Sequence, residues 1–461
     1  MVRLFKHYIP HAVVLLVALE LVLLLCAAEA AWHLRIWQIG SVPGLLRDRL
    51  SAMAIFAAAV QLSLIGVGGY AIEALRSVRV AATRLVVALL LAVLVISVVA
   101  FLLPGDLFWR SILLYAVAFA FAGIILLRVL AGPLLGTATF VRRVVVMGAG
   151  ARAARLHRLS GKPNAGFHIA AFIDMRDAPV AVPSATERVD IPDLARFIDR
   201  MQAGEVVLAL QERRNALPLQ DLLRVKTGGV QVTDFSSFLE RETGRVDLDT
   251  LNPSWLIFSD GFAYGARVAT FAKRGFDILT SLGLLLLTWP VIVVGALLVK
   301  LESAGPAFFR QTRIGLNGEP FVLVKLRSMR VDAERDGAQW AQENDPRVTR
   351  IGKLLRTLRI DELPQLYTVL RGRMSFVGPR PEVPTFVDRL TDELPYYAER
   401  HMVKPGITGW AQINFPYGAS LEDSRHKLEY DLYYAKNYSP FLDLLILLQT
   451  IRVILWPGGA R

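Results

Sequence analysis

The chain has very little cysteine and few charged residues for its length. A single cysteine, Cys26, occurs in 461 residues and lies inside an apolar run. This excludes a disulfide framework within the chain. Charged residues make up only 20% of the sequence, whereas apolar residues make up 54%. Such a composition excludes an ordinary soluble protein and indicates insertion into a lipid bilayer.

A nucleic-acid-binding motif and a cleavable signal peptide are also missing from the sequence. The net charge of +12 would also suit nucleic acid, but without such a motif nucleic acid is not expected as a partner. In a membrane protein it favours anionic headgroups or phosphorylated substrates. The first apolar run leads to no clear small-residue cleavage site, so we expect it to remain in the protein.

Four apolar runs fill residues 1–135, and each is about long enough to span a bilayer core of ~30 Å. They are Ala12–Ala31, Leu50–Tyr70, Leu85–Leu103 and Ser111–Leu127. An even number of spans returns the chain to its starting side. Basic residues that favour a cytoplasmic start lie in the second connector and after the fourth run: Arg76, Arg79, Arg84, Arg128, Arg142 and Arg143. Arginines in the first connector argue the other way: Arg35, Arg47 and Arg49.

Glu20 interrupts the first apolar run. A carboxylate in mid-membrane costs roughly 2.5–3.5 kcal/mol on insertion scales. One interpretation is a proton or ligand site. We favour the other, a packing residue that is bonded to a neighbouring helix.

Residues 138–265 have the composition of a soluble domain. The run Val144–Val146 leads to Gly148 and Gly150, a helical pattern follows, and a second predicted strand ends at Asp174. A strand, a glycine turn, a helix and an acidic residue after the next strand resemble a Rossmann nucleotide site. The third glycine of that fingerprint is Ala153 here. Two interpretations remain open. One is nucleotide binding, and the other, which is favoured, is a Rossmann-like fold that serves as a scaffold or regulatory module.

The third region, residues 270–461, begins with Lys273 and Arg274 and an uncharged run, Ile278–Val299. Pro290 interrupts this run, and an interior proline kinks or breaks a helix. The residues alone leave two topologies open. One is a fifth span, and the other is a re-entrant helix over 273–301 that bends and leaves on the side it entered.

Two further helices are predicted in this region. Residues 351–358 place Ile351, Leu354, Leu355 and Leu358 on one stripe, a pattern typical of a helix lying in the bilayer interface. Packing on a protein core is the alternative. The C-terminal run over 441–455 is apolar but short and carries Asp443 and Arg452, so a surface helix or a subunit contact is expected there rather than a span.

The stretch RIDELPQLYTVLRGR, residues 359–373, carries the adjacent carboxylates Asp361 and Glu362. Pro364 suits the first turn of a helix, which would put Asp361 at or near the N-cap, where an anion is stabilised and stays ionised. Basic residues that match phosphate oxygens surround the pair in the sequence: Lys325, Arg327, Arg347, Arg356 and Arg380. Carboxylates and arginines, together with Mg²⁺, would make a phosphoryl-transfer site. On these residues alone the other interpretation is favoured, in which Asp361 only caps a helix and Glu362 forms a surface ion pair.

The region from Lys273 to Pro457 resembles the monotopic phosphoglycosyl transferases, the bacterial sugar transferase family. The resemblance covers about 40% of the chain. The matching strings, in order, are KRGFDI, GPAFFRQTRIG, LVKLRSM, DPRVTRIGKLLR, IDELPQLYTVLRGRMSFVGPRPE, KPGITGWAQIN and KLEYDLYY. Four spans and a Rossmann-like module ahead of them resemble the long, multidomain members that initiate exopolysaccharide or O-antigen assembly. The string from Asn414 resembles the exopolysaccharide subgroup.

This resemblance implies transfer of a sugar-1-phosphate from a UDP-sugar to a polyprenyl phosphate, with release of UMP. It implies that Asp361 is the nucleophile of a covalent aspartyl-phosphosugar. Glu362 would help to hold Mg²⁺ and to orient or activate the lipid phosphate, and Arg380 would clamp phosphate. The rest of the implied pocket is Pro381, Lys325, Arg327 and Arg356.

The resemblance also implies a membrane topology. It favours the re-entrant helix broken at Pro290, anchored at headgroups by Lys273 and Arg274, with the catalytic domain on the cytoplasmic face of the bacterial inner membrane. Long members tend to associate, so a homodimer is expected on that ground alone. Arg373 departs from the family pattern, which commonly has an acidic residue there.

Two other functions compete with this one. Four spans and a Rossmann-like domain also resemble membrane-bound nucleotide-sugar dehydratases or epimerases. Those enzymes need a Tyr-x-x-x-Lys pair, whereas the only tyrosine in 138–265, Tyr264, has no lysine four residues on. An inactive membrane scaffold is the other alternative, and the intact Asp361–Glu362 pair argues against it. The donor sugar is not readable from the sequence.

Overall fold

The structure is a computed structural model of the chain. It describes residues 2–4, 7–9, 11–42, 44–70, 74–75, 77–102, 110–134, 141–162, 165–211, 217–251, 267–333, 335, 345–415, 418 and 420–455. Arg76 and Tyr264 lie outside these ranges, as do positions 416, 417 and 419 of the string that begins at Asn414. The contacts divide the chain into two compact units, and the main boundary between them in the sequence lies between Gly244 and Arg245.

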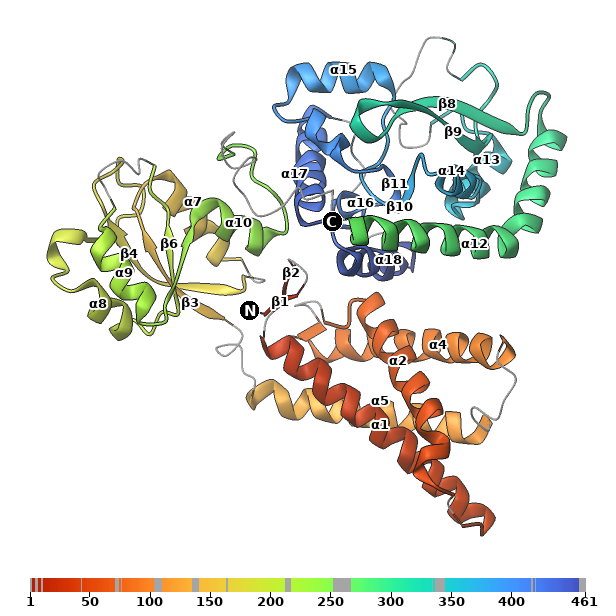
Figure 1. Cartoon of the computed structure of the whole chain (residues 1–461), viewed down its shortest axis with the longest axis horizontal. Helices are drawn as coiled ribbons and strands as arrows, with labels where there is room; N and C mark the ends of the chain where they lie inside the picture. The colour runs from red at the N-terminus through yellow and green to blue at the C-terminus, as the bar shows by residue number, and fades with distance from the viewer. Residues whose placement is uncertain are drawn as a thin grey trace. The chain divides into compact units, whose positions relative to one another are not determined.

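The first unit begins with the predicted apolar helices. They are α1 (His11–Ile39), α2 (Leu50–Gly66), α4 (Val78–Leu102) and α5 (Arg110–Leu134), preceded by the paired strands β1 (Val2–Leu4) and β2 (His7–Ile9) and, before α2, by the 3-10 turn η1 (Leu46–Arg49). α1 packs against α5 and α2, and α4 packs against α2 and α5, as Figure 1 shows. Each of these helices is long and apolar enough to cross a membrane, so the four predicted runs are confirmed as membrane-span candidates.

Glu20 is fully buried among these helices. Its Oε1 accepts a hydrogen bond of 2.7 Å from Arg128 Nε, and its Oε2 accepts one from the Tyr70 hydroxyl. Arg128 also donates to the carbonyl of Gly69 over 3.0 Å. The favoured interpretation of Glu20, a packing residue bonded to a neighbouring helix, agrees with these contacts. They tie α1 to α5 and to the end of α2.

The second part of this unit is a five-stranded parallel sheet in the order β5-β4-β3-β6-β7. The strands are β3 (Arg142–Met147), β4 (Phe167–Asp174), β5 (Thr186–Glu187), β6 (Glu205–Leu208) and β7 (Gln231–Asp234). The helices are α7 (Ala151–Ser160), η2 (Arg188–Asp190), α8 (Leu194–Arg200), α9 (Leu219–Thr227) and α10 (Phe235–Thr243). Numbered along the chain, this is the Rossmann order 3-2-1-4-5, so the Rossmann-like prediction is confirmed.

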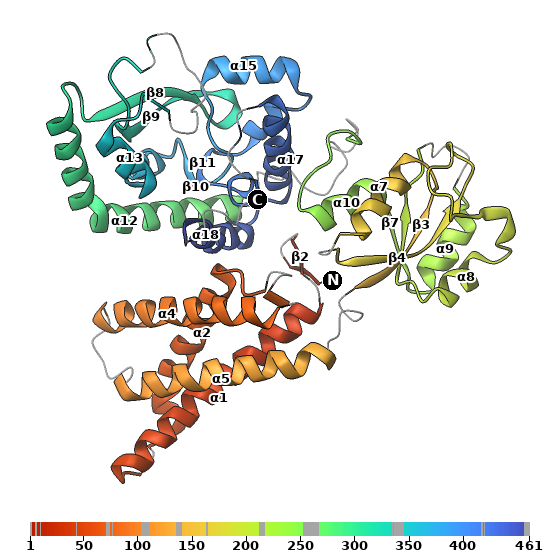
Figure 2. The ribbon, with the colours of Figure 1, turned by 180° about the vertical axis from the view of Figure 1, so that it is seen from behind.

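Helices cover both faces of this sheet, as Figure 2 shows from behind. α7 and α10 share one apolar core with the strands, and α8 and α9 share the other. The strands are therefore apolar on both sides. This explains the continuous Val144–Val146 run that predicted a strand.

The second unit holds the acidic pair. It begins with the long helix α12 (Arg267–Glu302) and the antiparallel hairpin of β8 (Phe308–Ile314) and β9 (Pro320–Leu326), joined through η3 (Leu316–Gly318). The following elements are α13 (Arg350–Thr357), η4 (Ile360–Glu362), α14 (Gln365–Leu370), β10 (Ser375–Val377), α15 (Pro384–Glu393), η5 (Ala398–Met402), β11 (Gly406–Thr408), α16 (Trp410–Asn414), α17 (Leu421–Asn437) and α18 (Pro440–Leu455). β10 and β11 pair in parallel.

α12 and α18 differ in how they pack within this unit. Figures 1 and 2 show α12 bent along its length, and Pro290 lies inside it. Proline is a common cause of such kinks because it removes a helical hydrogen bond. α12 is also a candidate span over Thr270–Glu302, whereas α18 is not among the candidates found in the described residues. α18 instead buries Leu442 and Ile446 in the core of the unit.

We expect Glu20→Ala to destabilise the helices of the first unit. The substitution leaves the Arg128 guanidinium buried without its carboxylate, and breaking a buried pair costs about 3–5 kcal/mol. Thermal unfolding of the purified protein in detergent should show a clearly lower Tm. The double variant Glu20→Leu/Arg128→Met should recover much of that loss, because it removes both charges. An unchanged Tm for Glu20→Ala would contradict a structural role for the pair.

Candidate active site

The acidic pair lies in a tight turn after α13. Arg359 adopts a left-handed conformation with φ 56° and ψ 19°, which is uncommon outside glycine, and it turns the chain into η4. Ile360, the first residue of η4, packs against the buried cluster of Val299, Leu326 and Leu355. The acidic pair follows directly. Apolar packing at one position therefore fixes where both carboxylates lie.

Asp361 is not the cap of the helix that follows it. Pro364 is the N-cap residue of α14, so the proline does suit the helix start. Asp361 lies three residues earlier, inside η4. The predicted capping position is therefore corrected, because a 3-10 turn intervenes between the acidic pair and the helix.

The Asp361 carboxylate is buried, with 6% of the residue exposed. Its Oδ1 atom has no hydrogen-bond partner among the described residues. Burial and the neighbouring charge of Glu362 raise the pKa of the Asp361 carboxyl above its ordinary value. This differs from the expectation that a helix terminus favours its charged form. A desolvated oxygen with free lone pairs is suited to attack an electrophile or to bind a cation.

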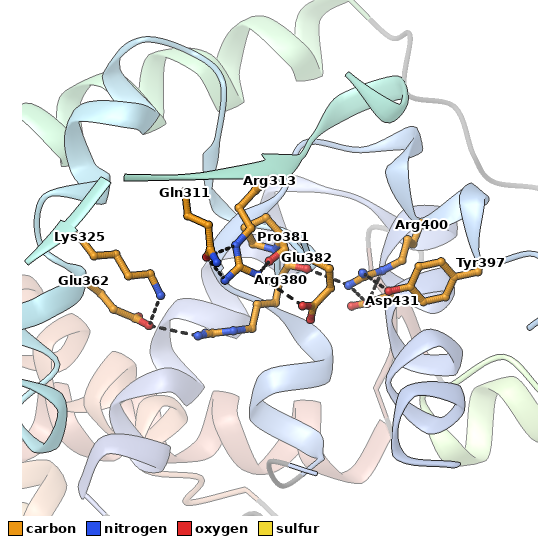
Figure 3. Close-up of polar contacts among 10 residues, drawn as sticks. All are labelled: Gln311, Arg313, Lys325, Glu362, Arg380, Pro381, Glu382, Tyr397, Arg400 and Asp431. Atoms are coloured by element: carbon orange, nitrogen blue, oxygen red, sulfur yellow. Dashed lines mark hydrogen bonds and ion pairs between the residues drawn. The ribbon is translucent and has the colours of Figure 1, made fainter. Parts of the chain in front are cut away.

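Glu362 has the opposite surroundings. Its Oε1 lies 3.3 Å from Arg380 Nη2, 3.6 Å from Lys325 Nζ and 3.7 Å from Arg359 Nη1. Figure 3 shows Lys325 and Arg380 both pointing toward this carboxylate. Burial alone would raise the pKa of Glu362, but the three cations outweigh it and hold the pKa at about 2. Glu362 is therefore a fixed negative charge and a weak proton acceptor.

A pocket opens beside these cations. Its lining residues are Arg313, Leu323, Lys325, Gln365, Arg380, Pro381, Gly406 and Ile407. Burial and the charges of Arg380 and Arg313 together lower the pKa of Lys325 to about 8, against the opposing effect of the Glu362 charge. Lys325, Arg380 and Pro381 are thus brought together as predicted. Three basic side chains around one pocket suit a ligand with more than one negative charge.

Two predicted phosphate-binding arginines have other partners. Arg327 is buried, and its Nη atoms donate to the carbonyls of Ala304 and Ser303 over 2.9 and 2.8 Å. It therefore holds the end of α12, as cations commonly do at helix C-termini. Arg347 pairs with Asp345 over 2.6 Å in the loop before α13. The structure places neither guanidinium among the pocket-lining residues.

Arg356 lies near the acidic pair. Its Nε donates to Ser328 Oγ over 3.0 Å. Its positive charge opposes the rise in the pKa of Asp361 that burial causes. Arg356 is therefore an electrostatic neighbour of Asp361, although it does not line the pocket.

The two basic residues at the start of α12 also differ from their predicted surroundings. Lys273 is buried, and its Nζ lies 2.5 Å from Asp443 Oδ2. Arg274 donates to the carbonyls of Val369 and Leu370 over 2.7 and 2.6 Å. Both cations have partners inside the protein. The prediction that they anchor at lipid headgroups is therefore corrected, and both have a structural role instead.

Glycines let the Arg380 loop approach its neighbours. A Cβ on Gly378 would lie 2.1 Å from the carbonyl oxygen of Lys404, and one on Gly409 would lie 2.2 Å from that of Gly378. No other residue fits such close backbone contacts. The glycine before the Pro-Arg-Pro string thus lets the loop lie against the residues just before and just after β11.

The donor set is compatible with Mg²⁺. Within the described ranges no group of three or more His, Cys, Asp or Glu residues could hold a metal ion. Magnesium sites commonly use one or two carboxylates, with phosphate oxygens of the substrate and water completing the shell. Asp361 Oδ1 and the Glu362 carboxylate could supply the protein's share.

The Rossmann-like domain carries its own predicted site, around the glycine turn. Gly148 has φ +121°, and a Cβ there would lie 2.9 Å from the Ala209 carbonyl oxygen. The segment after β4 packs on this turn: Ala181 N donates to Ala149 O over 2.7 Å, and a Cβ on Gly150 would lie 2.9 Å from Ala178 Cβ. A dinucleotide needs close approach to this turn, so these contacts favour the scaffold interpretation.

Asp174 and Ala153 agree with that interpretation. Asp174 ends β4 as predicted, is 8% exposed, and accepts a hydrogen bond of 2.8 Å from Arg176 N. Ala153, at the third glycine position, is fully buried in the core shared with α10. Both residues serve the packing of the domain.

Sequence reasoning missed several residues of the site. Arg313 and Gln365 line the pocket, and Arg359 is a partner of Glu362. A signal for Arg313 was present: on a strand, Gln311 and Arg313 share one face with Phe309, and all three are half-buried. Gln365 gave no signal, because its burial depends on packing between distant segments.

Comparison with known proteins decides the family. Residues 268–457 match the family described as bacterial sugar transferase, and residues 66–227 match a CoA-binding domain family. A 197-residue stretch is 43% identical to the UDP-glucose:undecaprenyl-phosphate glucose-1-phosphate transferase of Caulobacter vibrioides, covering 42% of this chain and 74% of that protein. The chain belongs to the bacterial sugar transferase family. The predicted family membership is therefore confirmed.

Other members of the family extend the likeness. The UDP-N-acetylgalactosamine-undecaprenyl-phosphate N-acetylgalactosaminephosphotransferase of Aeromonas hydrophila is 46% identical over 240 residues, which cover 52% of this chain and 56% of that protein. A UDP-glucose:undecaprenyl-phosphate glucose-1-phosphate transferase of Xanthomonas campestris is 33% identical over 333 residues, or 68% of this chain and 67% of that protein. The match thus spans little more than half the length of the Aeromonas relative. It reaches beyond the sugar transferase region in the Xanthomonas one.

Proposed function

We propose that this chain transfers a hexose-1-phosphate from a UDP-sugar to undecaprenyl phosphate, giving undecaprenyl diphosphate-sugar and UMP. The observation that carries the proposal is the buried Asp361 oxygen without a hydrogen-bond partner, next to a carboxylate clamped by Lys325 and Arg380. The names of the Aeromonas and Caulobacter relatives support the same reaction class. Such a transfer would begin exopolysaccharide or O-antigen-type assembly.

The chemistry proceeds in two displacements. An Asp361 carboxylate oxygen attacks the sugar-bearing phosphorus, the bond from that phosphorus to the UMP oxygen breaks, and UMP leaves with the electron pair. An oxygen of the lipid phosphate then attacks the same phosphorus and returns Asp361 as a carboxylate. A nucleophile of raised basicity suits the first step, and splitting one displacement in two lowers each barrier.

The other charges of the site bind and orient the phosphates. Arg380, Lys325 and Arg313 neutralise the donor diphosphate in the pocket that they line. Mg²⁺ held near Asp361 and Glu362 would add charge neutralisation at the leaving UMP. With its pKa at about 2, Glu362 fits the role of an ionic support better than that of a base that activates the lipid phosphate.

The topology of α12 belongs to this proposal. Much of its surface is apolar and exposed, including Leu279 at 73%, Leu287 at 74% and Leu301 at 82%. On α13, Leu355 packs inside, whereas Leu354 and Leu358 are more than half exposed. We propose that α12 enters the bilayer, bends at Pro290 and leaves on the same face, and that α13 lies in the interface. The catalytic domain would then lie at the cytoplasmic face of the inner membrane.

The Rossmann-like domain is a scaffold, in keeping with the covered glycine turn. A homodimer stays a prediction that follows from the family.

We expect Asp361→Asn to lower UMP release by more than about 10³-fold, because it removes the nucleophile. The assay uses the full chain in nanodiscs with Mg²⁺, undecaprenyl phosphate and a panel of UDP-sugars. Asp388→Asn, an exposed carboxylate on α15, is the matched control and should leave the rate unchanged. Release that survives Asp361→Asn would rule out the covalent route. No release by the wild-type protein with any donor would favour the inactive scaffold.

The pH dependence should report Lys325. Its ammonium attracts the donor only while protonated, and its pKa is about 8. We expect kcat/KM, which reports the free enzyme, to fall as the pH rises through 8. Lys325→Arg keeps the charge and should move this alkaline limb upward, whereas Lys353→Arg, at an exposed position on α13, should not. A limb that stays in place in Lys325→Arg would assign it to another group.

Cysteine labelling tests the path of α12. With Cys26 replaced by Ala, cysteines are placed at Ala272 and Lys300, exposed positions near the two ends of the helix. For a re-entrant helix, a membrane-impermeant maleimide should label both sites from the same side of sealed vesicles. Labelling from opposite sides would establish a fifth span instead.

A further inference from the structure

Arg380 lies outside regular structure, between β10 and α15, and its side chain is 39% exposed. A side chain on a loop keeps its place only if its own backbone is held. Pro379 and Pro381 flank it and have no N–H to donate. The carbonyl groups of this segment therefore carry much of the task of fixing it.

Four consecutive carbonyl oxygens of the segment accept hydrogen bonds. Pro379 O accepts from Gly406 N over 2.9 Å, and Glu382 O accepts from Ile314 N over 3.0 Å. The two carbonyls between them accept from side chains rather than from backbone. Arg400 Nη2 donates to Arg380 O, and Arg313 Nη1 donates to Pro381 O, each over 3.0 Å.

Arg400 is itself held on its other sides. Its Nε and Nη2 donate to Asp431 Oδ2 over 3.0 and 2.7 Å, and its Nη1 donates to the Tyr397 hydroxyl over 2.9 Å. Figure 3 shows this chain of contacts running from Arg380 to Tyr397. Arg400, Asp431 and Tyr397 are each no more than 5% exposed. The planar guanidinium thus joins three groups at fixed angles, which a lysine ammonium does not reproduce.

A buried ion pair is a weak source of stability, because desolvation offsets its attraction. Arg400 does not line the pocket, whereas Arg313 does. Stability and direct ligand contact are therefore both poor explanations of Arg400. Its bond to the Arg380 carbonyl is the contact that links it to the pocket.

We propose that Arg400, held by Asp431 and Tyr397, is a positioning residue that fixes the Arg380 backbone and so sets the Arg380 side chain against Glu362 and the donor diphosphate. This inference rests on the proposed function. A misplacement of about 1 Å in a positioned group can cost about 10²-fold in rate. The effect of Arg400 should accordingly pass through Arg380.

A double-mutant cycle measures that dependence. Arg400→Lys is made in the wild-type chain and in Arg380→Lys, and kcat/KM for UMP release is measured in nanodiscs with the UDP-sugar that the wild-type protein uses. We expect Arg400→Lys to lower kcat/KM by about 10- to 100-fold in the wild-type background. In the Arg380→Lys background, Arg400→Lys should lower kcat/KM by no more than about 2-fold, because the side chain that Arg400 positions has already been changed.

Two further variants keep the test decisive. Ile446→Val, a core change on α18, should lower Tm slightly in both backgrounds and leave kcat/KM unchanged. If Arg400→Lys does not fold, Tyr397→Phe removes one hydrogen bond to Arg400 and should show a smaller loss with the same dependence on Arg380.

Equal fold-losses in both backgrounds, or no loss in the wild-type background, would overturn the positioning role while leaving the proposed function in place. A wild-type protein that releases no UMP with any donor would overturn both.

Discussion

The Glu362 carboxylate pairs with three cations, and the rest of the site depends on these ion pairs. Two adjacent carboxylates repel one another, and the repulsion grows as water is excluded. Lys325, Arg359 and Arg380 stabilise one of the two charges. Asp361 then lies beside a permanent negative charge and inside the protein, which together raise its pKa. One turn of chain thereby holds two carboxyl groups of opposite electrostatic character, a division of roles common in active sites.

The catalytic unit supports this turn with buried and half-buried arginines. Arg327 binds carbonyls at the end of α12, Arg274 binds carbonyls at the end of α14, and Arg400 binds the Arg380 carbonyl. Each donates to backbone oxygens at the end of a helix or in a loop. The basic composition of the domain therefore serves its interior as well as its ligands. This explains why the sequence predicted more phosphate-binding arginines than line the pocket.

Much of the fold could be predicted because the relevant signals are local. The apolar runs gave α1, α2, α4 and α5, and the β-branched run before Gly148 gave β3. The acidic pair stood out because Asp361 and Glu362 adjoin a proline, and the family strings supplied Arg380. The contact partners of Lys273, Arg327 and Arg347 were not predictable in this way. The sequence around a basic residue does not show whether its side chain contacts phosphate, lipid or a carbonyl oxygen far along the chain.

The pairing of Lys273 with Asp443 joins positions 170 residues apart. α12 leaves the ribosome long before its partner helix α18 exists. At about 5–20 residues per second the interval is roughly 10–30 s. During that time the Lys273 ammonium lacks the Asp443 carboxylate that accompanies it into the interior, so burial of the start of α12 is unfavourable until α18 is made. The ion pair that holds the start of α12 in the catalytic domain can therefore form only after α18 has been synthesised.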